Sequence, residues 1–339
     1  MNNRYIILSP QCRGTFLQRI SELYLHLGNY LDLEKAEGRH LCYTKIFLSD
    51  AFNQYSELKH SLLFKELLSK AANTIIEQPP LIGSKISLLI KTSSNIRPFI
   101  FQSFRLTGKE ANGKDSYFQT TCLFQKYLKS LEGTGMTMAK NLIRTWIYVR
   151  DIDVNYPGVV QARNSLFQKQ GLTSQTHFIA STGIGGYSSS PKAGVAMDFL
   201  TYPNIEEKNI QYLKAPDHLN PTQDYGVAFE RGTKVTINGE QQFFISGTAS
   251  INKKGKVMYP GDITRQTARL LENIGTLLAD GGAIMKDIKY FIVYLRDDAD
   301  AETTENFMNQ VYPDIPHILV HAKVCRPEWL IEMECVAEK

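Results

Sequence analysis

The hexapeptide WIYVRD at residues 146–151 returns as IVYLRD at residues 292–297. Both copies are rich in β-branched and aromatic residues and end in a charged turn, a composition typical of a buried strand. Each copy follows an apolar stretch of helical period that ends in glycine, at Gly133 and Gly135 in the first copy and at residues 281–282 in the second. Glycine after the last periodic residue marks a helix stop. The shared order of helix, glycine and strand predicts an internal duplication.

The two copies also continue alike after these strands. A second amphipathic segment follows at residues 159–170 and 303–311, and a second strand-like run follows at residues 176–184 and 316–324. Each copy reads hairpin, helix, strand, helix, strand, and we expect the second copy to close on a hairpin across residues 326–328. This order predicts an α+β fold in which helices cover one face of a mixed sheet. The alternative interpretation is two unrelated α/β halves that share a common strand type.

The start of the chain has a different pattern, and the segment PPLIG at residues 79–83 marks its end, because proline and glycine interrupt regular structure. We expect an N-terminal α/β extension over residues 1–85. A diverged first repeat then occupies residues 86–215, and the second repeat occupies residues 216–339.

The composition is that of an ordinary globular protein. Of the 339 residues, 43% are hydrophobic and 21% are charged, which argues against a disordered chain, collagen or a coiled coil. The 38 Lys and Arg against 34 Asp and Glu leave a net charge of only +4, without basic runs, so we expect no nucleic-acid partner. No window reaches the roughly 18 apolar residues of a transmembrane helix, and residues 1–10 lack the apolar core of a signal peptide. We therefore expect a cytoplasmic protein that does not associate with membranes.

The five cysteines and seven histidines form no metal-binding pattern. The cysteines are widely spaced without a CxxC motif, which fits reduced thiols better than disulfides or a zinc ribbon. No HExxH motif is present, and His317 and His321 fall in a strand-like run, where a spacing of four residues is not helical. We expect neither a metal nor a cofactor.

The second repeat resembles the reactive-intermediate deaminase (Rid) family over residues 243–337. The resemblance is carried by the segments SGT (246–248), GDI (261–263), QT (266–267), ENI (272–274), GG (281–282), VYLRD (293–297) and IEME (331–334). It implies that both repeats are Rid-like domains with mixed sheets of the chorismate mutase-like type. Stand-alone members of the family have an arginine two residues after the proline that opens the penultimate strand. Here that proline is Pro316, and Ile318 occupies the position of the arginine. Because an apolar side chain cannot clamp a carboxylate, Ile318 argues against deaminase activity.

The chain from about residue 100 onward resembles the chorismatase family, in which a diverged half precedes a Rid-like half. The segments that carry this resemblance are RTWIY (144–148), ARN (162–164), ASTGIG (180–185), HLNPT (218–222), YGVAFERG (225–232) and FISGTAS (244–250). The resemblance implies cofactor-free removal of pyruvate from chorismate, with Glu332 in the place of the family's proton-donating glutamate. Cys325 and Gly247 are typical of the subgroup that forms 3-hydroxybenzoate.

The surroundings of Glu332 also suit an acid. Cleavage of the enolpyruvyl ether of chorismate without a metal requires a proton on the enol carbon, and a carboxyl group kept neutral by low polarity can supply it. The neighbours of Glu332 at positions 330, 331 and 333 are apolar. Strand alternation places Glu334 on the same face as Glu332. We interpret Glu334 as structural, and the alternative interpretation is that both carboxylates are solvated.

The expected hairpin across residues 326–328 places Lys323 opposite Glu332 and Cys325 diagonal to it, at about 7 to 8 Å between backbones. A thiol at this position would reach the same pocket, and the alternative for Cys325 is a small buried hydrophobic residue. A cation opposite Glu332 would lower the pKa of its carboxyl, which opposes the acid role. The alternatives are that Lys323 binds substrate or that the turn is longer than residues 326–328.

Two substrate carboxylates require fixed cationic donors. We rank Arg231 first, Arg144 second and Arg163 third as clamps, and each has the alternative of a surface cation. The full set of residues expected to bind substrate is Arg231, Arg144, Arg163, Tyr212, Tyr225, Gly247 and Thr248. The tyrosines would donate hydrogen bonds from their hydroxyls, with packing as the alternative. Gly247 would allow a ligand to approach the backbone closely, with a β-bulge as the alternative.

The sequence therefore predicts a chorismate lyase or hydrolase that releases pyruvate and a hydroxybenzoate, with 3-hydroxybenzoate favoured by Cys325. The alternatives are formation of 4-hydroxybenzoate, hydrolysis to a dihydroxycyclohexadiene carboxylate, a Rid-type imine deaminase and a ligand-binding protein without catalysis. Rid proteins resemble trimers with sites between subunits, and a duplicated chain supplies such an interface by itself. We expect a monomer with a pseudo-oligomeric domain interface.

Overall fold

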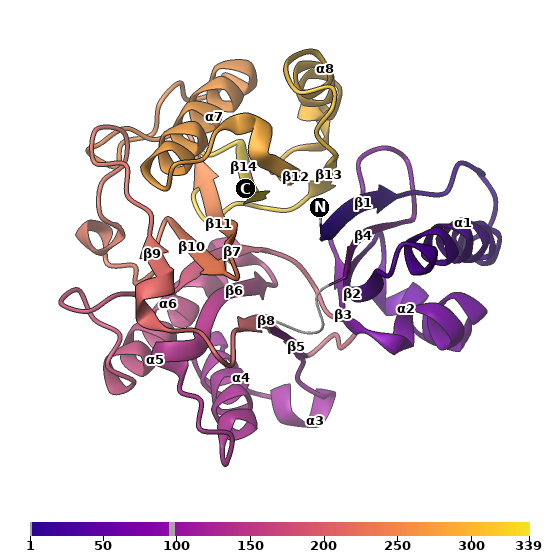
Figure 1. Cartoon of the computed structure of the whole chain (residues 1–339), viewed down its shortest axis with the longest axis horizontal. Coiled ribbons are helices and arrows are strands. Elements are labelled where there is room, and N and C mark those ends of the chain that lie inside the picture. Colours follow the sequence, from indigo (N-terminus) through magenta and orange to yellow (C-terminus); the bar gives the residue numbers. More distant parts are fainter. Residues whose placement is uncertain (1, 95–98) are drawn as a thin grey trace.

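The computed structural model of the protein describes residues 2–94 and 99–339, apart from the side chain of Tyr225. The strands of the described residues form three mixed sheets, and the longer helices lie on the outer faces of these sheets (Figure 1). We refer to the regions around the three sheets as the N-terminal, middle and C-terminal domains.

The regular elements follow one another in the same alternation in each domain. The N-terminal domain contains β1 (Asn3–Leu8), α1 (Phe16–Ala36), β2 (His40–Leu48), α2 (Ala51–His60), the short turns η1 (Leu63–Leu67) and η2 (Leu68–Lys70), β3 (Ala72–Glu77) and β4 (Ile86–Ser93). The middle domain contains β5 (Ile100–Phe104), α3 (Gly108–Ala111), α4 (Ser116–Leu131), α5 (Met138–Asn141), β6 (Leu142–Val149), α6 (Ile152–Lys169), β7 (Ala180–Gly185) and β8 (Val195–Thr201). The C-terminal domain contains η3 (Glu207–Asn209), β9 (Ile210–Tyr212), η4 (Thr222–Tyr225), β10 (Gly232–Ile237), β11 (Glu240–Ala249), α7 (Ile263–Asp280), η5 (Met285–Asp287), β12 (Ile288–Leu295), η6 (Asp298–Asp300), α8 (Ala301–Val311), β13 (His317–His321) and β14 (Ile331–Glu338).

The sheets of the middle and C-terminal domains have the same strand order, which confirms the predicted α+β fold with two Rid-like domains. The middle sheet has the order β5-β8-β6-β7, and the C-terminal sheet contains β11-β14-β12-β13 with β10 and β9 added at one edge. In both sheets the last two strands of this order are parallel and the other pairs are antiparallel. The repeated sequence motif therefore forms the equivalent strands β6 and β12.

The N-terminal extension repeats this arrangement a third time. Its sheet has the order β1-β4-β2-β3, in which only β2 and β3 are parallel. The segment KIFLSD at residues 45–50 occupies the place of the repeated hexapeptide. The aspartate that ends each copy is the N-cap of the following helical segment, at Asp50, Asp151 and Asp297. The chain thus consists of three units with one topology.

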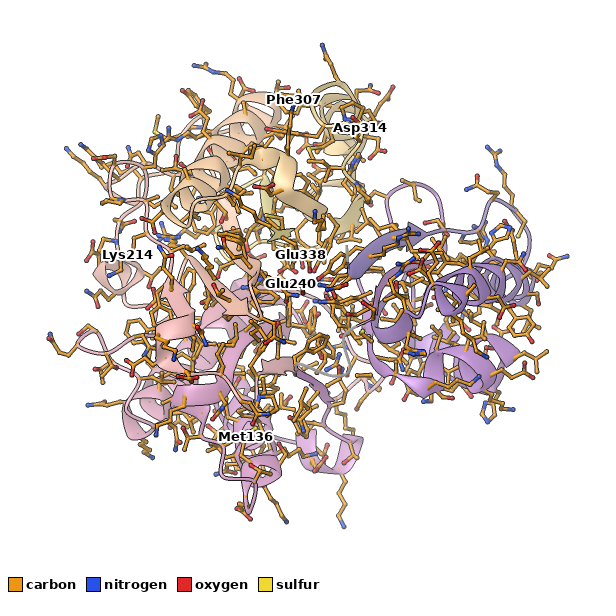
Figure 2. The ribbon with its side chains drawn as sticks, in the orientation of Figure 1. Met136, Lys214, Glu240, Phe307, Asp314 and Glu338 are labelled. Carbon is orange, nitrogen blue, oxygen red and sulfur yellow. The ribbon has the colours of Figure 1, made fainter. Side chains whose placement is uncertain are left out.

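The three domains surround a common centre, and each contributes an inner sheet face (Figure 1). Within the described residues, β3 lies beside β5, β7 beside β11 and β1 beside β12. Glu338 at the end of β14 lies near this centre (Figure 2), where it accepts hydrogen bonds from Tyr5 (2.7 Å) and Asn3 (3.0 Å) of β1. One hydrophobic core therefore extends through all three domains.

The domain boundaries lie away from the expected positions. β4 pairs with β1 and β2, so the first sheet extends past residue 85 to Ser93. β9 pairs with β10, so the C-terminal sheet begins before residue 216. β4 lies between β1 and β2, and β9 is the edge strand beside β10.

The expected hairpin across residues 326–328 is wrong. β14 lies between β11 and β12, and β13 pairs only with β12 among the described strands. All residues of β14 except the last are buried, and a strand that is buried on both faces takes a central position rather than an edge. Lys323 therefore does not face Glu332 and instead lies 3.2 Å from Asp153 of α6.

No helix in residues 2–94 and 99–339 is long and apolar enough to cross a membrane. In the same part of the chain, no group of three or more His, Cys, Asp and Glu side chains is arranged to hold a metal ion.

Candidate active site

A cavity of about 410 Å³ lies at the junction of the middle and C-terminal domains, where β7 and α6 face β11 and β14. Its lining consists of Tyr156, Pro157, Val160, Gln161, Arg163, Ser181, Gly183, Val227, Phe229, Arg231, Gly247, Ala249, Ile251, Cys325, Arg326, Trp329 and Glu332. The volume is in the range of small-molecule sites, and a mostly apolar wall with a few convergent polar groups is typical of them. Five residues expected from the sequence to act in the site meet here.

A larger hollow of about 990 Å³ lies beside α1, β2 and β5. None of the expected site residues lines it. Its only lining arginine among the described residues, Arg39, is already paired with Glu34 at 2.6 Å. The smaller cavity is the better candidate because it combines a buried acid with arginines, a combination that is typical of functional sites.

The acid of the cavity is Glu332 on β14. Its position is opposite Tyr294 of β12 on one side and Ala249 of β11 on the other. The residue is 4% exposed, and its burial, together with the negative charge of Glu334, raises the pKa of its carboxyl to about 8. Arg144 and Arg231 lower this pKa only in part. Glu332 therefore carries its proton at neutral pH, as the acid role requires.

Gly247 provides the space for the Glu332 carboxyl. The pairing of β11 with β14 is irregular between Ile245 and Thr248, and a Cβ atom on Gly247 would overlap Glu332 Oε1. The Gly247 backbone N–H donates to Thr182 Oγ1 at 2.9 Å. The glycine thus lets the acid lie directly against the backbone of β11.

Arg144 lies outside the lining of the cavity, contrary to its expected role as a clamp for substrate. Its Nη2 is 2.9 Å from Glu334 Oε2, and its Nη1 donates to Ser246 Oγ at 3.1 Å. Glu334 also accepts a hydrogen bond from Trp146 Nε1 at 2.7 Å. Because Glu334 and Arg144 are both buried, the guanidinium is needed to neutralise the carboxylate.

Arg163 and Arg231 line the cavity as expected. Arg163 on α6 is 1% exposed, and its Nε and Nη2 atoms have no hydrogen-bond partner among the described residues. Arg231 donates to the backbone carbonyl of Asn220 at 3.1 Å. The two guanidinium carbons lie 5.9 and 5.4 Å from the centre of the Phe229 ring. The buried, unpaired N–H groups of Arg163 make it the stronger candidate for an anionic ligand.

Sequence reasoning missed a third arginine and the aromatic walls of the cavity. Arg326 lies over the Trp329 ring, with 4.9 Å between its guanidinium carbon and the ring centre. Tyr156 of α6 forms another wall beside Gly183. The sequence signal for Arg326 is its place next to Cys325.

Cys325 lines the cavity even though the hairpin is absent. Its burial and the nearby Glu332 raise the pKa of the thiol to about 12. A raised pKa favours the neutral thiol at physiological pH, which argues against a thiolate nucleophile in the ligand-free protein. A neutral thiol can still shape the pocket or exchange a hydrogen bond.

Three residues that were expected to bind substrate are not found in the lining of the cavity. Tyr212 on β9 stacks on His177, with 4.5 Å between the ring centres, outside the cavity. Thr248 donates to the Ser246 carbonyl at 2.8 Å and is also absent from the lining. The side chain of Tyr225 lies outside the described residues.

The chain thus consists of Rid-like domains, and the candidate cavity lies between two of them. The chain has the fold of a chorismatase over its whole length: a crystal structure of chorismatase aligns with a TM-score of 0.69 and 18% identity, covering 99% of each chain. The resemblance to the chorismatase family with a Rid-like C-terminal domain, expected from the sequence, is confirmed for the fold.

The C-terminal domain is also similar in sequence to known proteins. The family model "Endoribonuclease L-PSP" matches residues 231–339. A RutC family protein of Pyrococcus abyssi is 30% identical over 128 residues, which cover 37% of this chain and 92% of that protein. The 3-aminoacrylate deaminase RutC of Acinetobacter baylyi is 28% identical over 96 residues, which cover 28% of this chain and 76% of that protein. The chain belongs to the RutC family through its C-terminal domain.

Proposed function

We propose that the protein is a cofactor-independent enzyme that transforms chorismate and releases pyruvate. The observation that carries the proposal is that one cavity holds the buried carboxyl of Glu332, whose pKa is raised to about 8, and the guanidinium of Arg163, whose Nε and Nη2 have no hydrogen-bond partner among the described residues. Chorismate has two carboxylates and an acid-sensitive enol ether, so it needs both kinds of group. The chorismatase fold agrees with this assignment.

Glu332 is the general acid of the proposed reaction. Its proton goes to the terminal vinyl carbon of the enolpyruvyl group, and the ether oxygen then stabilises the adjacent positive charge as an oxocarbenium ion. The C–O bond to pyruvate breaks after addition of water to that ion, or while the ring rearranges and loses a proton. The proton released by the added water, or by the ring, returns the Glu332 carboxylate to its neutral form. Transfer to carbon is slow without a positioned acid, and a carboxyl with a raised pKa suits the step.

Arg163 and Arg231 hold the carboxylates of the substrate. The lining contains three arginines, with Arg326 as the third, against one neutral carboxyl. A dianion therefore enters a cavity of opposite charge, where charge-assisted hydrogen bonds are strong because water is excluded. The Phe229 ring lies beside the guanidinium groups of both Arg163 and Arg231.

We propose 3-hydroxybenzoate as the aromatic product. Its formation needs no net water, because chorismate then divides into pyruvate and a hydroxybenzoate, whereas the dihydroxycyclohexadiene carboxylate requires one. Cys325 supports the choice because its neutral thiol lines the pocket with Glu332. The buried Ile318 of β13 is 2% exposed and absent from the lining, which argues against an imine deaminase that uses this position.

The test is incubation of the purified protein with chorismate and separation of the products by chromatography. We expect pyruvate and 3-hydroxybenzoate in equal amounts. The variant Glu332→Gln removes the proton but keeps the shape, so it should still bind chorismate and release no pyruvate. Imine hydrolysis without action on chorismate would establish a deaminase instead. Tight binding of chorismate without any product in the wild type would establish a ligand-binding protein.

A further inference from the structure

Two buried carboxyl groups lie on the same face of β14 at successive inward positions. Glu332 is 4% exposed and Glu334 is 2% exposed. The rise of an extended strand places their backbones about 7 Å apart. At this separation inside a protein, the charge on one carboxyl strongly affects the protonation of the other.

The surroundings of the two groups are unequal. Glu334 forms an ion pair with Arg144 at 2.9 Å, accepts from Trp146 at 2.7 Å and from Thr182 at 2.5 Å, and lies 3.9 Å from Lys45 Nζ. Hydrogen bonds and cations of this kind stabilise a carboxylate. Glu332 is instead affected by burial and by the surrounding charges, and its carboxyl forms no hydrogen bond with the residues that the structure describes. Glu334 is therefore the ionised member of the pair.

All three domains contribute to this asymmetry. Lys45 comes from β2 of the N-terminal domain, Arg144 and Trp146 from β6, Thr182 from β7, and Glu334 from β14. The other charged or titratable side chains around Glu332 are Arg231, Arg163, Arg326, Arg144, Cys325, Tyr156 and Tyr294. The arginines among them favour the ionised form of Glu332, and Glu334 is the anion that opposes them.

We propose that Glu334 is a positioning residue whose locked carboxylate keeps the catalytic proton on Glu332. The proposal rests on the proposed role of Glu332 as the acid. Without the charge on Glu334, the substrate-binding arginines would lower the pKa of Glu332, and the carboxyl would lose its proton before chorismate binds. Glu334 was interpreted from the sequence as a structural residue, and the proposed role extends this interpretation. Its ion pair with Arg144 joins two domains and also keeps the charge on Glu334 that acts on Glu332.

The size of the effect follows from Coulomb's law. Two charges about 7 Å apart at an effective dielectric constant of about 20 interact strongly enough to move a pKa by roughly 1.5 pH units. In the wild type we expect the rate of pyruvate release to fall as pH rises through about 8, where Glu332 loses its proton. In Glu334→Gln this fall should occur near pH 6.5. The rate would then drop about eightfold at pH 7.5 and stay close to the wild-type rate at pH 5.5.

Two variants separate this effect from damage to the fold. Asp198→Asn removes a fully buried carboxylate from the equivalent position of β8, where it pairs with Arg105 at 2.9 Å. This variant should lose similar stability but keep the alkaline fall near pH 8. Glu334→Asp keeps the charge and should also keep the wild-type profile. A merely structural Glu334 predicts a uniform loss of rate at every pH in Glu334→Gln, and that result would overturn the proposal.

A direct titration tests the inference apart from turnover. The carbonyl stretch of protonated Glu332, assigned as the infrared band lost in Glu332→Gln, should disappear near pH 8 in the ligand-free wild type and near pH 6.5 in Glu334→Gln. An unmoved band refutes the role of Glu334 whatever the protein does to chorismate. A shifted band in a protein that releases no pyruvate refutes the proposed function and leaves this electrostatic coupling standing. If Glu334→Gln does not fold, the double variant Glu334→Gln/Arg144→Met leaves no unpaired arginine and should show a smaller shift to lower pH.

Discussion

Replacement of Arg163 by methionine should make the ligand-free protein more stable and weaken its binding of chorismate. The residue lies on α6 at 1% exposure, and two of its guanidinium nitrogens lack a hydrogen-bond partner among the described residues. Methionine is unbranched and similar in length, so it fills the same space without bringing N–H groups into the interior. A residue kept for binding rather than for stability has this signature.

The magnitude follows from two opposing terms. Each unsatisfied buried polar group costs about 1 to 3 kcal/mol. The cation–π contact of Arg163 with Phe229, at 5.9 Å, is worth about 0.5 to 1 kcal/mol and is lost in the variant. The net expectation is a gain of about 1 kcal/mol or more in the free energy of unfolding. Removal of a buried, charge-assisted clamp should weaken chorismate binding by about 2 to 4 kcal/mol, a factor of about 30 to 1,000 in Kd.

The assay combines urea unfolding of the ligand-free protein with calorimetric titration of chorismate. The titration is made in the Glu332→Gln background, so that substrate is not consumed. Arg144→Met is the matched control, because it also removes a buried arginine of the middle domain. It should destabilise the protein by about 3 to 5 kcal/mol, since Glu334 is left as a buried charge without its main partner. If Arg163→Met loses stability like the control and binds chorismate as the wild type does, Arg163 is a structural residue and the reasoning is refuted.

Two further substitutions probe the shape of the cavity. Gly247→Ala should lower kcat about 100-fold, because the added Cβ overlaps Glu332 Oε1 and turns the acid away from the substrate; circular dichroism should show an intact fold, and an unchanged kcat would mean that the carboxyl acts from another position. Cys325→Ala should shift the products, resolved by chromatography, from 3-hydroxybenzoate toward the dihydroxycyclohexadiene carboxylate; an identical product mixture would exclude the thiol from the ring step.

The sequence contained the fold in its local patterns. The repeated hexapeptide and the glycine that follows each helix were sufficient to predict two copies of one unit. The third copy was missed, although KIFLSD at residues 45–50 has the same place before a helix and the same final aspartate. Its first residue is Lys45, where the other copies have Trp146 and Ile292, and a charged residue hides the pattern of a buried strand. Only the tertiary structure explains this lysine, since Lys45 lies 3.7 Å from the centre of the Trp146 ring.

The site was predictable only where it depends on neighbours along the chain. The apolar residues next to Glu332 in the sequence predicted a buried acid, and the structure places this carboxyl in a cavity. The ranking of Arg144 above Arg163 was wrong because the partner of Arg144 is Glu334, 190 residues away. No local pattern shows which of two buried arginines is already neutralised. The position of Lys323 was wrong for the same reason, because pairing across the sheet rather than the turn determines what lies opposite β14.

The threefold repetition also explains how the acid can occur in one domain and be absent from the equivalent positions of the other two. Strand register places Glu332 opposite Tyr294, and the equivalent pairs in the other two sheets are Ala196 opposite Tyr148 and Ser87 opposite Phe47. Only the C-terminal domain therefore has a carboxyl at this position. In a homotrimer every subunit would carry the same residue, whereas a single chain with three units can place an acid in one interface and use the others for stability. Asp198 illustrates the second use: it occupies the position of Glu334 in the middle sheet and pairs with Arg105 at 2.9 Å, but with Ala196 two residues before it there is no acid for its charge to control.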